Sequence, residues 1–265
     1  MEKYGVINSV PSALALEPME IVSKKYKFLP TTQAIDIFME SGWEPVQASQ
    51  VYIRSKVSLR NGFQKHLIKF RNPKLGMMKV GGKDTVIELL LKNSHDTTAC
   101  FHIMAGLFVI LCTNGLVVTD SLMGNYKIPH LGFAVEKVKN AIDDIVERVP
   151  AVAKKVRNFS GIKLTEDERE QYALNALMLK YDIEDINSGA YDLKCLIEPR
   201  RKQDEAPTLW NTYNIVQENL LNGGNFTYNK FGTLIQSRPI KAIDANIRIN
   251  KSLWDLTEEY ARRKN

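Results

Sequence analysis

Cysteine is scarce in this chain of 265 residues. The three cysteines, Cys100, Cys112 and Cys195, are an odd number and show no spacing of a disulfide framework. A small secreted domain held together by disulfides is therefore excluded. A reduced, cytoplasmic environment fits this pattern best.

Long hydrophobic runs are also missing. The longest, residues 99–112, has 14 residues and contains His102, whereas a membrane-spanning helix needs about 20 apolar residues. The N-terminus carries Glu2 and Glu17 and has no basic stretch leading into an apolar one, so it does not resemble a signal peptide. We expect no membrane span and no membrane partner.

Acidic residues are absent from one long stretch of the chain. Residues 51–83 contain nine Lys or Arg and no Asp or Glu. Because the whole chain has a formal net charge of only +6, the remainder has a net charge of −3. Positive charge is therefore concentrated in this stretch, which is typical of a surface that binds a polyanion.

Within this stretch, Asn61-Gly62 separates two runs of alternating polar and apolar residues, which predicts a β-hairpin with a type I′ turn. A two-residue turn would pair Arg54 with Lys69. Side chains alternate between the two faces of a strand. The apolar face, expected to pack in the core, holds Val51, Ile53, Val57, Leu59, His66, Ile68 and Phe70. The other face holds six cations and no acid, and its candidate nucleic-acid-binding residues are Tyr52, Arg54, Lys56, Arg60, Phe63, Lys65, Lys69 and Arg71.

Two interpretations of this basic face remain open. Like charges opposite one another on neighbouring strands repel, so six unbalanced cations favour a surface that binds a polyanion. Tyr52 and Phe63 would then stack on the bases of a single strand. Alternatively, the face is simply solvated, because lysines on strands also discourage edge-to-edge aggregation.

The rest of the chain predicts an α+β fold, in which a hairpin-rich antiparallel sheet from the N-terminal half packs against helices from the C-terminal half. Further strands are expected in residues 75–80, 85–92 and 99–112, and helices in residues 33–41, 133–158, 165–180, 209–222 and 252–263. Pro150 should kink or break its helix, and Thr165 with Glu168 forms a capping box. We predict one domain, residues 1–265, with a β-rich core at 43–120 and a helical part at 129–265.

Side chains that could carry catalysis are few. His95, Cys100, His102 and Cys112 match no compact zinc motif. His95 and Asp96 could act as an acid/base pair, but no nucleophile or orienting third group accompanies them. We therefore expect no metal, no cofactor and no catalytic residues.

Two other enzyme signatures are weak or missing. The acids of residues 198–218 are too scattered to predict a two-metal nuclease. Gly81-Gly82-Lys83 lacks the spacing of a phosphate-binding loop and is better interpreted as a hairpin turn. The sequence thus leans away from an enzyme.

Two stretches carry a family resemblance. Residues 92–117, KNSHDTTACFHIMAGLFVILCTNGLV, resemble the "NSHDG…CSNGLV" signature of the phage/plasmid-like protein family called domain of unknown function 932. Residues 199–224, PRRKQDEAPTLWNTYNIVQENLLNGG, resemble its second signature, an Arg-Arg pair before "LW…N.VQEN…GG". EPMEIVSKKYKFLPT and NKSLWDLTEEY also resemble the family, so the resemblance spans most of the chain. Thr97 and Thr113 stand where the family often has Gly and Ser.

The resemblance implies a protein carried by phages, prophages or conjugative plasmids, in the cytoplasm of the bacterial host, and it implies no known activity. Members tend to sit among genes for DNA metabolism and for countering host defence. Nucleic acid, DNA or RNA, is therefore the expected partner, with a host defence protein as the alternative.

The polar residues of the two signatures also have two interpretations. Asn93, Ser94 and Asn219 either satisfy buried backbone groups or contact a ligand. Arg200 and Arg201 join the candidate nucleic-acid-binding residues because they could hold phosphate. Equally, they could lie in a solvated connector.

Three functions follow as hypotheses. The first is a single-stranded nucleic acid binding protein that anneals strands in recombination. A basic hairpin, further strands and then a long helix are similar to the β-β-β-α arrangement of the RecT, Redβ and Erf types of phage annealing proteins, which assemble into rings or filaments. A homo-oligomer is therefore expected. The second is an inhibitor that binds a host defence protein, and the least supported is a metal-dependent nuclease.

Overall fold

The computed structural model describes residues 5–55, 57–80, 83–109, 126–128, 135–181, 193–224, 226–228 and 233–264. It has the predicted α+β fold: an antiparallel sheet lies in the N-terminal half of the chain, and helices dominate the C-terminal half. No helix within these ranges is long and apolar enough to cross a membrane.

The chain divides into two compact units, which we name unit 1 and unit 2. Unit 1 comprises Met1–Met78, Asp84–Phe108 and Val117–Pro150, and unit 2 comprises Lys79–Lys83, Val109–Leu116 and Ala151–Asn265. Each unit therefore collects segments that are distant in the sequence. The single domain expected for residues 1–265 stays a prediction.

The main sheet has the strand order β1-β2-β4-β5-β6, and a short strand β3 pairs with β4. Its strands are β1 (Glu44–Gln50), β2 (His66–Arg71), β3 (Met78–Val80), β4 (Lys83–Asn93), β5 (Phe101–Val109) and β6 (Tyr126–Ile128). The strand predicted at residues 99–112 is confirmed over the range of β5. Ala99 and Cys100 precede the strand, and residues 110–112, including Cys112, lie outside the described residues.

One face of β2 is buried, as the alternation of its residues predicts. His66, Ile68 and Phe70 are all inaccessible to solvent. Phe38 of helix α1 (Thr31–Glu40) stacks on Phe70 with ring centroids 4.3 Å apart. The core of unit 1 therefore includes the layer between α1 and the sheet, as the apolar pattern indicates.

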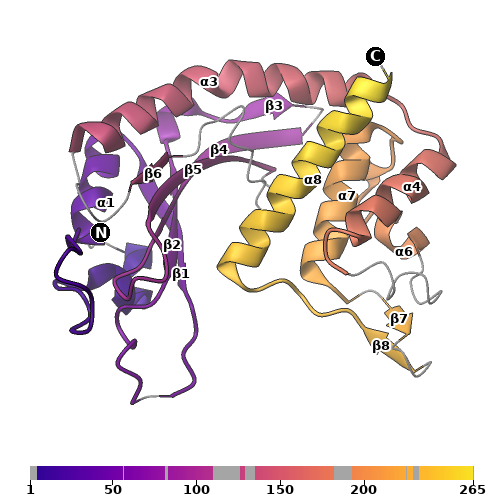
Figure 1. The fold of residues 1–265 in the computed structure, drawn as a ribbon. Helices are drawn as coiled ribbons and strands as arrows, with labels where there is room; N and C mark the ends of the chain where they lie inside the picture. The colour runs from indigo at the N-terminus through magenta and orange to yellow at the C-terminus, as the bar shows by residue number, and fades with distance from the viewer. Residues whose placement is uncertain are drawn as a thin grey trace. The chain divides into compact units, whose positions relative to one another are not determined.

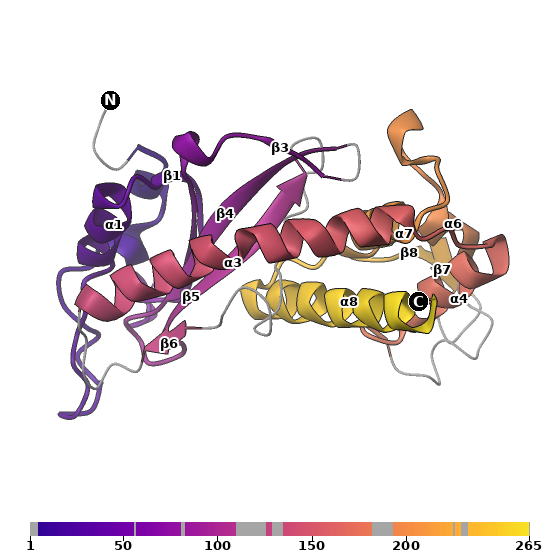
Figure 2. The ribbon, with the colours of Figure 1, turned by 90° about the horizontal axis from the view of Figure 1, so that it is seen from above.

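Helix α3 (Val135–Gly161) is the longest element of the fold described, and its first half belongs to unit 1. Figure 2 shows this half crossing β4 and β5, and its buried residues include Val138, Ala141, Ile142, Ile145 and Val149. Of the kink or break predicted at Pro150, the break is wrong, because the helix continues to Gly161. The boundary between the two units nevertheless falls directly after Pro150.

The predicted two-residue hairpin turn at Asn61-Gly62 is wrong. β1 ends at Gln50, which pairs with His66, so residues 51–65 connect the two strands as a long loop. A type I′ turn needs positive φ at both turn residues. Gly62 has a φ of +86°, but Thr97 is the only non-glycine residue with positive φ in the described part of the chain.

Tertiary pairing, rather than the turn, sets the register of these strands. β2 is held along its other side by β4, from His66 opposite Asn93 to Arg71 opposite Glu88. Lys69 consequently lies opposite Gln47 of β1, and its predicted pairing with Arg54 is wrong. A local Asn-Gly signal cannot override a register that buries one face of a central strand. We name residues 51–65 the β1–β2 loop, which projects beyond the ends of its strands (Figure 1).

Unit 2 is built around α7 (Leu209–Asn222), which has the predicted bounds. Thr208 Oγ1 accepts a hydrogen bond from the backbone N–H of Asn211 at 3.1 Å and caps the helix. The helix ends at Gly223, where a Cβ atom would lie 2.5 Å from the carbonyl oxygen of Ser237. Every residue from Leu209 to Leu221 is buried, so all sides of this helix are covered.

Several other elements of unit 2 pack against α7. Those that contact it are α4 (Glu166–Leu177), α6 (Leu193–Ile197), α8 (Ile243–Lys264) and the short helix η4 (Lys202–Asp204). The predicted capping box of α4 is confirmed, with Thr165 and Glu168 exchanging bonds of 3.2 and 2.8 Å. α8 begins well before the predicted Ser252. The short elements η1 (Gly5–Ser9), η2 (Pro11–Leu14), η3 (Pro73–Leu75), β7 (Phe226–Tyr228) and β8 (Leu234–Gln236) complete the fold described.

Candidate nucleic-acid interface

Residues 93–96, which we name the NSHD turn, begin at the last residue of β4 and lead towards β5. Their side chains have exposed fractions between 0 and 3%. Polar groups without access to water need partners within the chain. In this turn, those partners come from the N-terminal segment, α1 and the end of the β1–β2 loop.

The hydroxyl of Thr31 is the centre of a buried hydrogen-bond network. Its Oγ1 lies 2.9 Å from Nε2 of His66 and 3.0 Å from Nε2 of His95, and it accepts a bond from Nδ2 of Asn93 at 3.0 Å. Nδ1 of His66 faces the carbonyl oxygen of Gln64 at 3.1 Å. That nitrogen therefore carries the ring proton, and Nε2 accepts from the Thr31 hydroxyl. Because the hydroxyl has one proton, Nε2 of His95 must donate to it.

The imidazole of His66 is neutral in this arrangement, because its Nε2 accepts a hydrogen bond. Burial lowers the pKa of His66 to about 4, although the Gln64 carbonyl and the Asp96 carboxylate act in the opposite direction. Thr31 is the first residue of α1, and Pro30 occupies the N-cap position. The sequence contains no signal that Thr31, His66 and His95 meet, because they come from three distant segments.

The NSHD turn also holds two segments by backbone bonds. The N–H of His95 donates to the carbonyl of Phe63 at 2.8 Å, and its carbonyl accepts from the N–H of Met19 at 3.1 Å. The Tyr26 hydroxyl donates to the carbonyl of Ser94 at 3.2 Å. The turn is thus a common support for the β1–β2 loop and for the segment around residues 19–26.

Asp96 holds the loop through its side chain. Its Oδ2 lies 2.9 Å from Nε of Arg60, and its Oδ1 accepts from the hydroxyl and the N–H of Thr98 at 2.5 and 3.1 Å. Burial acts to raise the pKa of Asp96, but the bonds from Thr98, Arg60 and Ser94 outweigh it and lower the pKa. Asp96 is therefore ionised and forms an ion pair with Arg60.

The β1–β2 loop exposes a mixture of cationic and apolar side chains. Tyr52 is 84% exposed, Val57 91% and Leu59 68%, and Arg54 is also exposed. Val57 and Leu59 were expected in the core, and they lie outside it because the loop is not a strand. Phe63 and Lys65 are half-buried at the end of the loop next to β2. Lys56 lies outside the described residues.

The two predicted site residues on β2 are balanced by acids. The Nη2 atom of Arg71 lies 2.5 Å from Oε1 of Glu88 on β4, and Glu44 of β1 is its partner on the other side. Burial lowers the pKa of half-buried Lys69, with Glu88 acting against that shift and Arg71 with it. The acid-free basic face expected across the two strands of the hairpin is therefore wrong for β2. In the β1–β2 loop, Arg60 is paired with Asp96, and Arg54 is exposed.

The second signature forms an internal network in unit 2. Nε of Arg200 donates to Oδ1 of Asn219 at 2.8 Å. The Nδ2 group of Asn219 donates to the carbonyl oxygens of Cys195, Leu196 and Glu198 at 3.1 to 3.2 Å. Asn219 thus satisfies buried backbone groups, which is the structural interpretation of the two that the sequence left open.

Arg201 is part of a buried ionic network. Its guanidinium makes two bonds to Glu218 at 2.7 and 2.8 Å and lies 3.5 Å from Asp204. Asp204 in turn lies 2.5 Å from Nζ of Lys83, and both of these side chains are buried. Arg201 and Lys83 therefore face two internal carboxylates, so they are weaker candidates for phosphate binding than the loop cations.

The structure brings no candidate metal centre together in the part it describes. No group of three His, Cys, Asp or Glu side chains converges among the described residues. His102 on β5 is buried and Cys100 is half-buried. The prediction for Cys112 lies outside the described residues.

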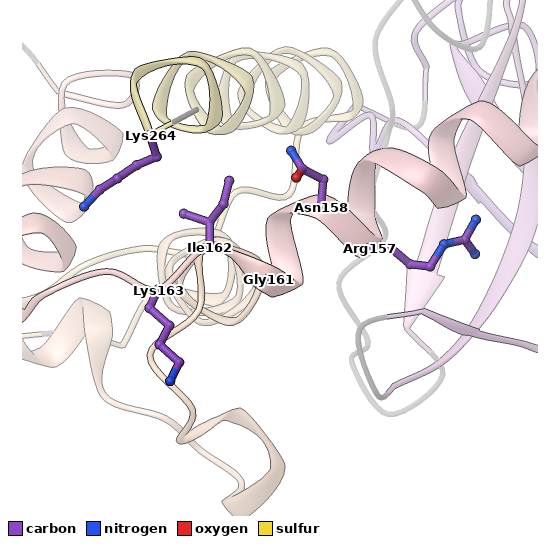
Figure 3. A pocket seen from close by; sticks show the side chains of 6 residues that line it. All are labelled: Arg157, Asn158, Gly161, Ile162, Lys163 and Lys264. Atoms are coloured by element: carbon purple, nitrogen blue, oxygen red, sulfur yellow. The ribbon is translucent and has the colours of Figure 1, made fainter.

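Unit 2 has an open pocket of about 470 Å³ with a basic lining, drawn in Figure 3. It is lined by Arg157, Asn158, Gly161, Ile162, Lys163 and Lys264. Figure 3 shows the three cations pointing in different directions, and Lys264 pairs with Glu168. The pocket also lies at the C-terminal ends of α3 and α8, whose carbonyl groups disfavour anions. It is therefore a poor phosphate site.

The family model described as "Domain of unknown function (DUF932)" matches residues 18–254. The chain belongs to this family. Both signatures lie within the matched range, and the resemblance predicted from them is confirmed. In this DUF932 protein, the first signature contains the NSHD turn, which holds the β1–β2 loop and the segment around residues 19–26. The second signature forms the polar networks around α7 in unit 2.

The chain is similar to two proteins of Escherichia coli (strain K12), the UPF0380 protein YafZ and the UPF0380 protein YfjQ. Each is 30% identical over 251 residues, which cover 94% of this chain and 87% of the relative. No solved structure matches the chain significantly.

Proposed function

We propose that the protein binds single-stranded nucleic acid, DNA or RNA, through the β1–β2 loop. The observation that carries this proposal is Tyr52, which is 84% exposed and lies two residues from the exposed Arg54 in a loop without acids. Proteins hold single strands by combining open aromatic rings, which stack on bases, with cations, which follow the phosphates. Both elements are present in this loop.

A single strand fits the loop better than a duplex. Val57 and Leu59 are among the most exposed apolar side chains of the described residues, at 91% and 68%. A duplex stacks its bases inside and presents phosphates and groove edges, whereas a single strand can turn apolar base faces towards the protein. A loop that combines cations with apolar side chains is complementary to the single strand.

We further propose that the protein anneals complementary strands in the recombination of a phage, prophage or plasmid. The support is an analogy of fold: antiparallel strands with a projecting loop, followed by the long helix α3, are similar to the β-β-β-α order of phage annealing proteins. Annealing brings two strands together, so we propose a homo-oligomer in the cytoplasm of the bacterial host.

Fluorescence anisotropy with a labelled single-stranded oligonucleotide across a salt series tests the binding proposal. We expect affinity to fall steeply with salt. Arg54→Glu should weaken binding about tenfold and reduce the salt slope by roughly 0.7, the value for one lost phosphate contact on a single strand. Tyr52→Ala should cost about 1–3 kcal/mol of binding free energy with less change in slope.

Lys139→Glu is the matched control, because Lys139 is an exposed lysine on α3 in unit 1. It changes the net charge by the same amount away from the loop. Absence of binding at low salt, or equal losses for Arg54→Glu and Lys139→Glu, would overturn the proposed role of the loop. Duplex of the same length should bind more weakly.

A second candidate function is inhibition of a host defence protein by direct binding. Exposed Val57 and Leu59 favour it, because neighbouring exposed apolar side chains are also typical of protein interfaces. A pull-down from nuclease-treated host lysate tests it. A partner that wild type retains and that Val57→Ser with Leu59→Ser loses, without any binding of oligonucleotide, would favour this function.

A further inference from the structure

Three lysines form a second cationic segment in unit 1. Lys24, Lys25 and Lys27 are all exposed, and the backbone turns here, with the N–H of Tyr26 donating to the carbonyl of Ser23 at 2.9 Å. Glu17 and Glu20 precede this turn and are exposed as well. Residues 23–27 themselves contain no acid.

The lysine segment is fixed to the same support as the β1–β2 loop. Tyr26, between Lys25 and Lys27, donates its hydroxyl to the carbonyl of Ser94 in the NSHD turn at 3.2 Å. Burial, with the Asp96 carboxylate nearby, raises the pKa of Tyr26 to about 12, so this donor keeps its proton. Asp96 also holds Arg60 of the loop at 2.9 Å.

Figures 1 and 2 both draw the N-terminal segment and the β1–β2 loop at the same end of the sheet. The NSHD turn joins them through neighbouring residues, with His95 bonded to Met19 on one side and to Phe63 on the other. The carboxylate of Asp96 is buried and already accepts bonds from Arg60 and Thr98. It is therefore not available to neutralise the lysines at the surface.

We propose that Lys24, Lys25 and Lys27 form the second half of the nucleic-acid site, so that one strand contacts both this segment and the β1–β2 loop. This inference rests on the proposed function and extends it to residues outside the basic stretch 51–83. Phosphates contacted by both segments add to the same electrostatic binding free energy. The NSHD turn then positions two binding segments without touching the strand.

The double variant Lys25→Glu with Lys27→Glu tests this inference, and Lys137→Glu with Lys139→Glu on α3 is its control of equal charge. Both pairs are exposed and belong to unit 1. In the anisotropy assay, we expect the first pair to weaken binding of a long single strand at least tenfold and to lower the salt slope by about 1.4. The control pair should change both quantities much less.

Measuring affinity for oligonucleotides of increasing length distinguishes a site with one contact segment from a site with two. We expect wild-type affinity to rise between short strands that reach only the loop and longer strands within the roughly 4–16 nucleotides of a typical site. The Lys25→Glu, Lys27→Glu variant should lose most of that rise. Ultraviolet crosslinking of wild type, followed by peptide mapping, should place crosslinks in residues 23–27 as well as in residues 51–65, and it does not depend on any variant folding.

The outcomes distinguish this inference from the function on which it rests. If wild type binds no single strand, the proposed function fails and this inference with it. If Arg54→Glu weakens binding while the lysine pair behaves like its control and residues 23–27 carry no crosslink, only the second half of the site is overturned. If a variant that combines Arg54→Glu with Lys25→Glu and Lys27→Glu binds as tightly as wild type, the strand binds elsewhere on the protein.

Discussion

Thr97, which follows the NSHD turn, has a backbone conformation that its residue type disfavours. Its φ is +67°, and left-handed conformations cost a β-branched residue of order 1–2 kcal/mol. Glycine has no such cost, although it loses more backbone entropy on folding. The family signature often has Gly here. We expect Thr97→Gly to raise the free energy of unfolding by about 0.5–1 kcal/mol in a urea titration.

Thr98→Gly is the matched control for this prediction. Thr98 donates both its hydroxyl and its N–H to Asp96, so loss of its side chain should destabilise the protein. A lower free energy of unfolding for Thr97→Gly would contradict the claim that Thr97 is strained.

His66 predicts a defined dependence of stability on pH. Its pKa is about 4 in the folded chain and 6.5 without burial, so between these values the unfolded chain binds more protons. Stability from this group is fully present above pH 6.5 and is lost as pH falls towards 4, by about 3 kcal/mol in all. Urea unfolding measured from pH 7.5 to 4.5 should show this decline.

The variant His66→Gln should be less stable at pH 7.5 and should lose most of the decline towards pH 4.5. Asp96 acts in a different window, because its pKa is lowered from 3.8 and its contribution disappears only below that value. An unchanged pH profile in His66→Gln would show that another group titrates in this range.

At the scale of elements, α7 depends on polar side chains as much as on apolar ones. The amide N–H groups of Asn219 serve three carbonyl oxygens. Asn219→Asp would replace these donors with a carboxylate facing carbonyl oxygens, at a cost of several kcal/mol. We expect a large fall in thermal midpoint, whereas Asn222→Asp, exposed at the end of the same helix, should be nearly neutral. Equal effects would argue against the network.

The elements that sequence predicted well are those whose ends are decided locally. Thr208 and Gly223 bound α7 through a side-chain cap and a left-handed glycine, and the Thr165 capping box opens α4. β1 and β2 do pair antiparallel, but the predicted turn and register are wrong. β2 also pairs with β4, which follows it in the sequence, and a local turn signal carries no information about that pairing. The preference of Asn-Gly for a tight turn is weaker than the pairing of a central strand whose one face is buried.

At the scale of the whole molecule, the candidate interface could be predicted only in part. The acid-free stretch 51–83 pointed to the β1–β2 loop, and Tyr52 and Arg54 are exposed there. The ion pairs of Arg60, Arg71 and Lys83 could not be predicted, because their acids come from the NSHD turn, from β4 and from η4. Net charge along a sequence therefore overstates the charge that a folded surface presents.

The way in which the two units share the chain limits how such a protein can evolve. The chain passes between them repeatedly, and α3 belongs to both. A genetic exchange at any point between residues 83 and 150 would build unit 1 from two different parents. It would also separate buried partners such as Lys83 and Asp204, which would then come from different parents. Recombination cannot exchange one unit of this fold without disrupting the other. We therefore expect the gene to be inherited as a whole.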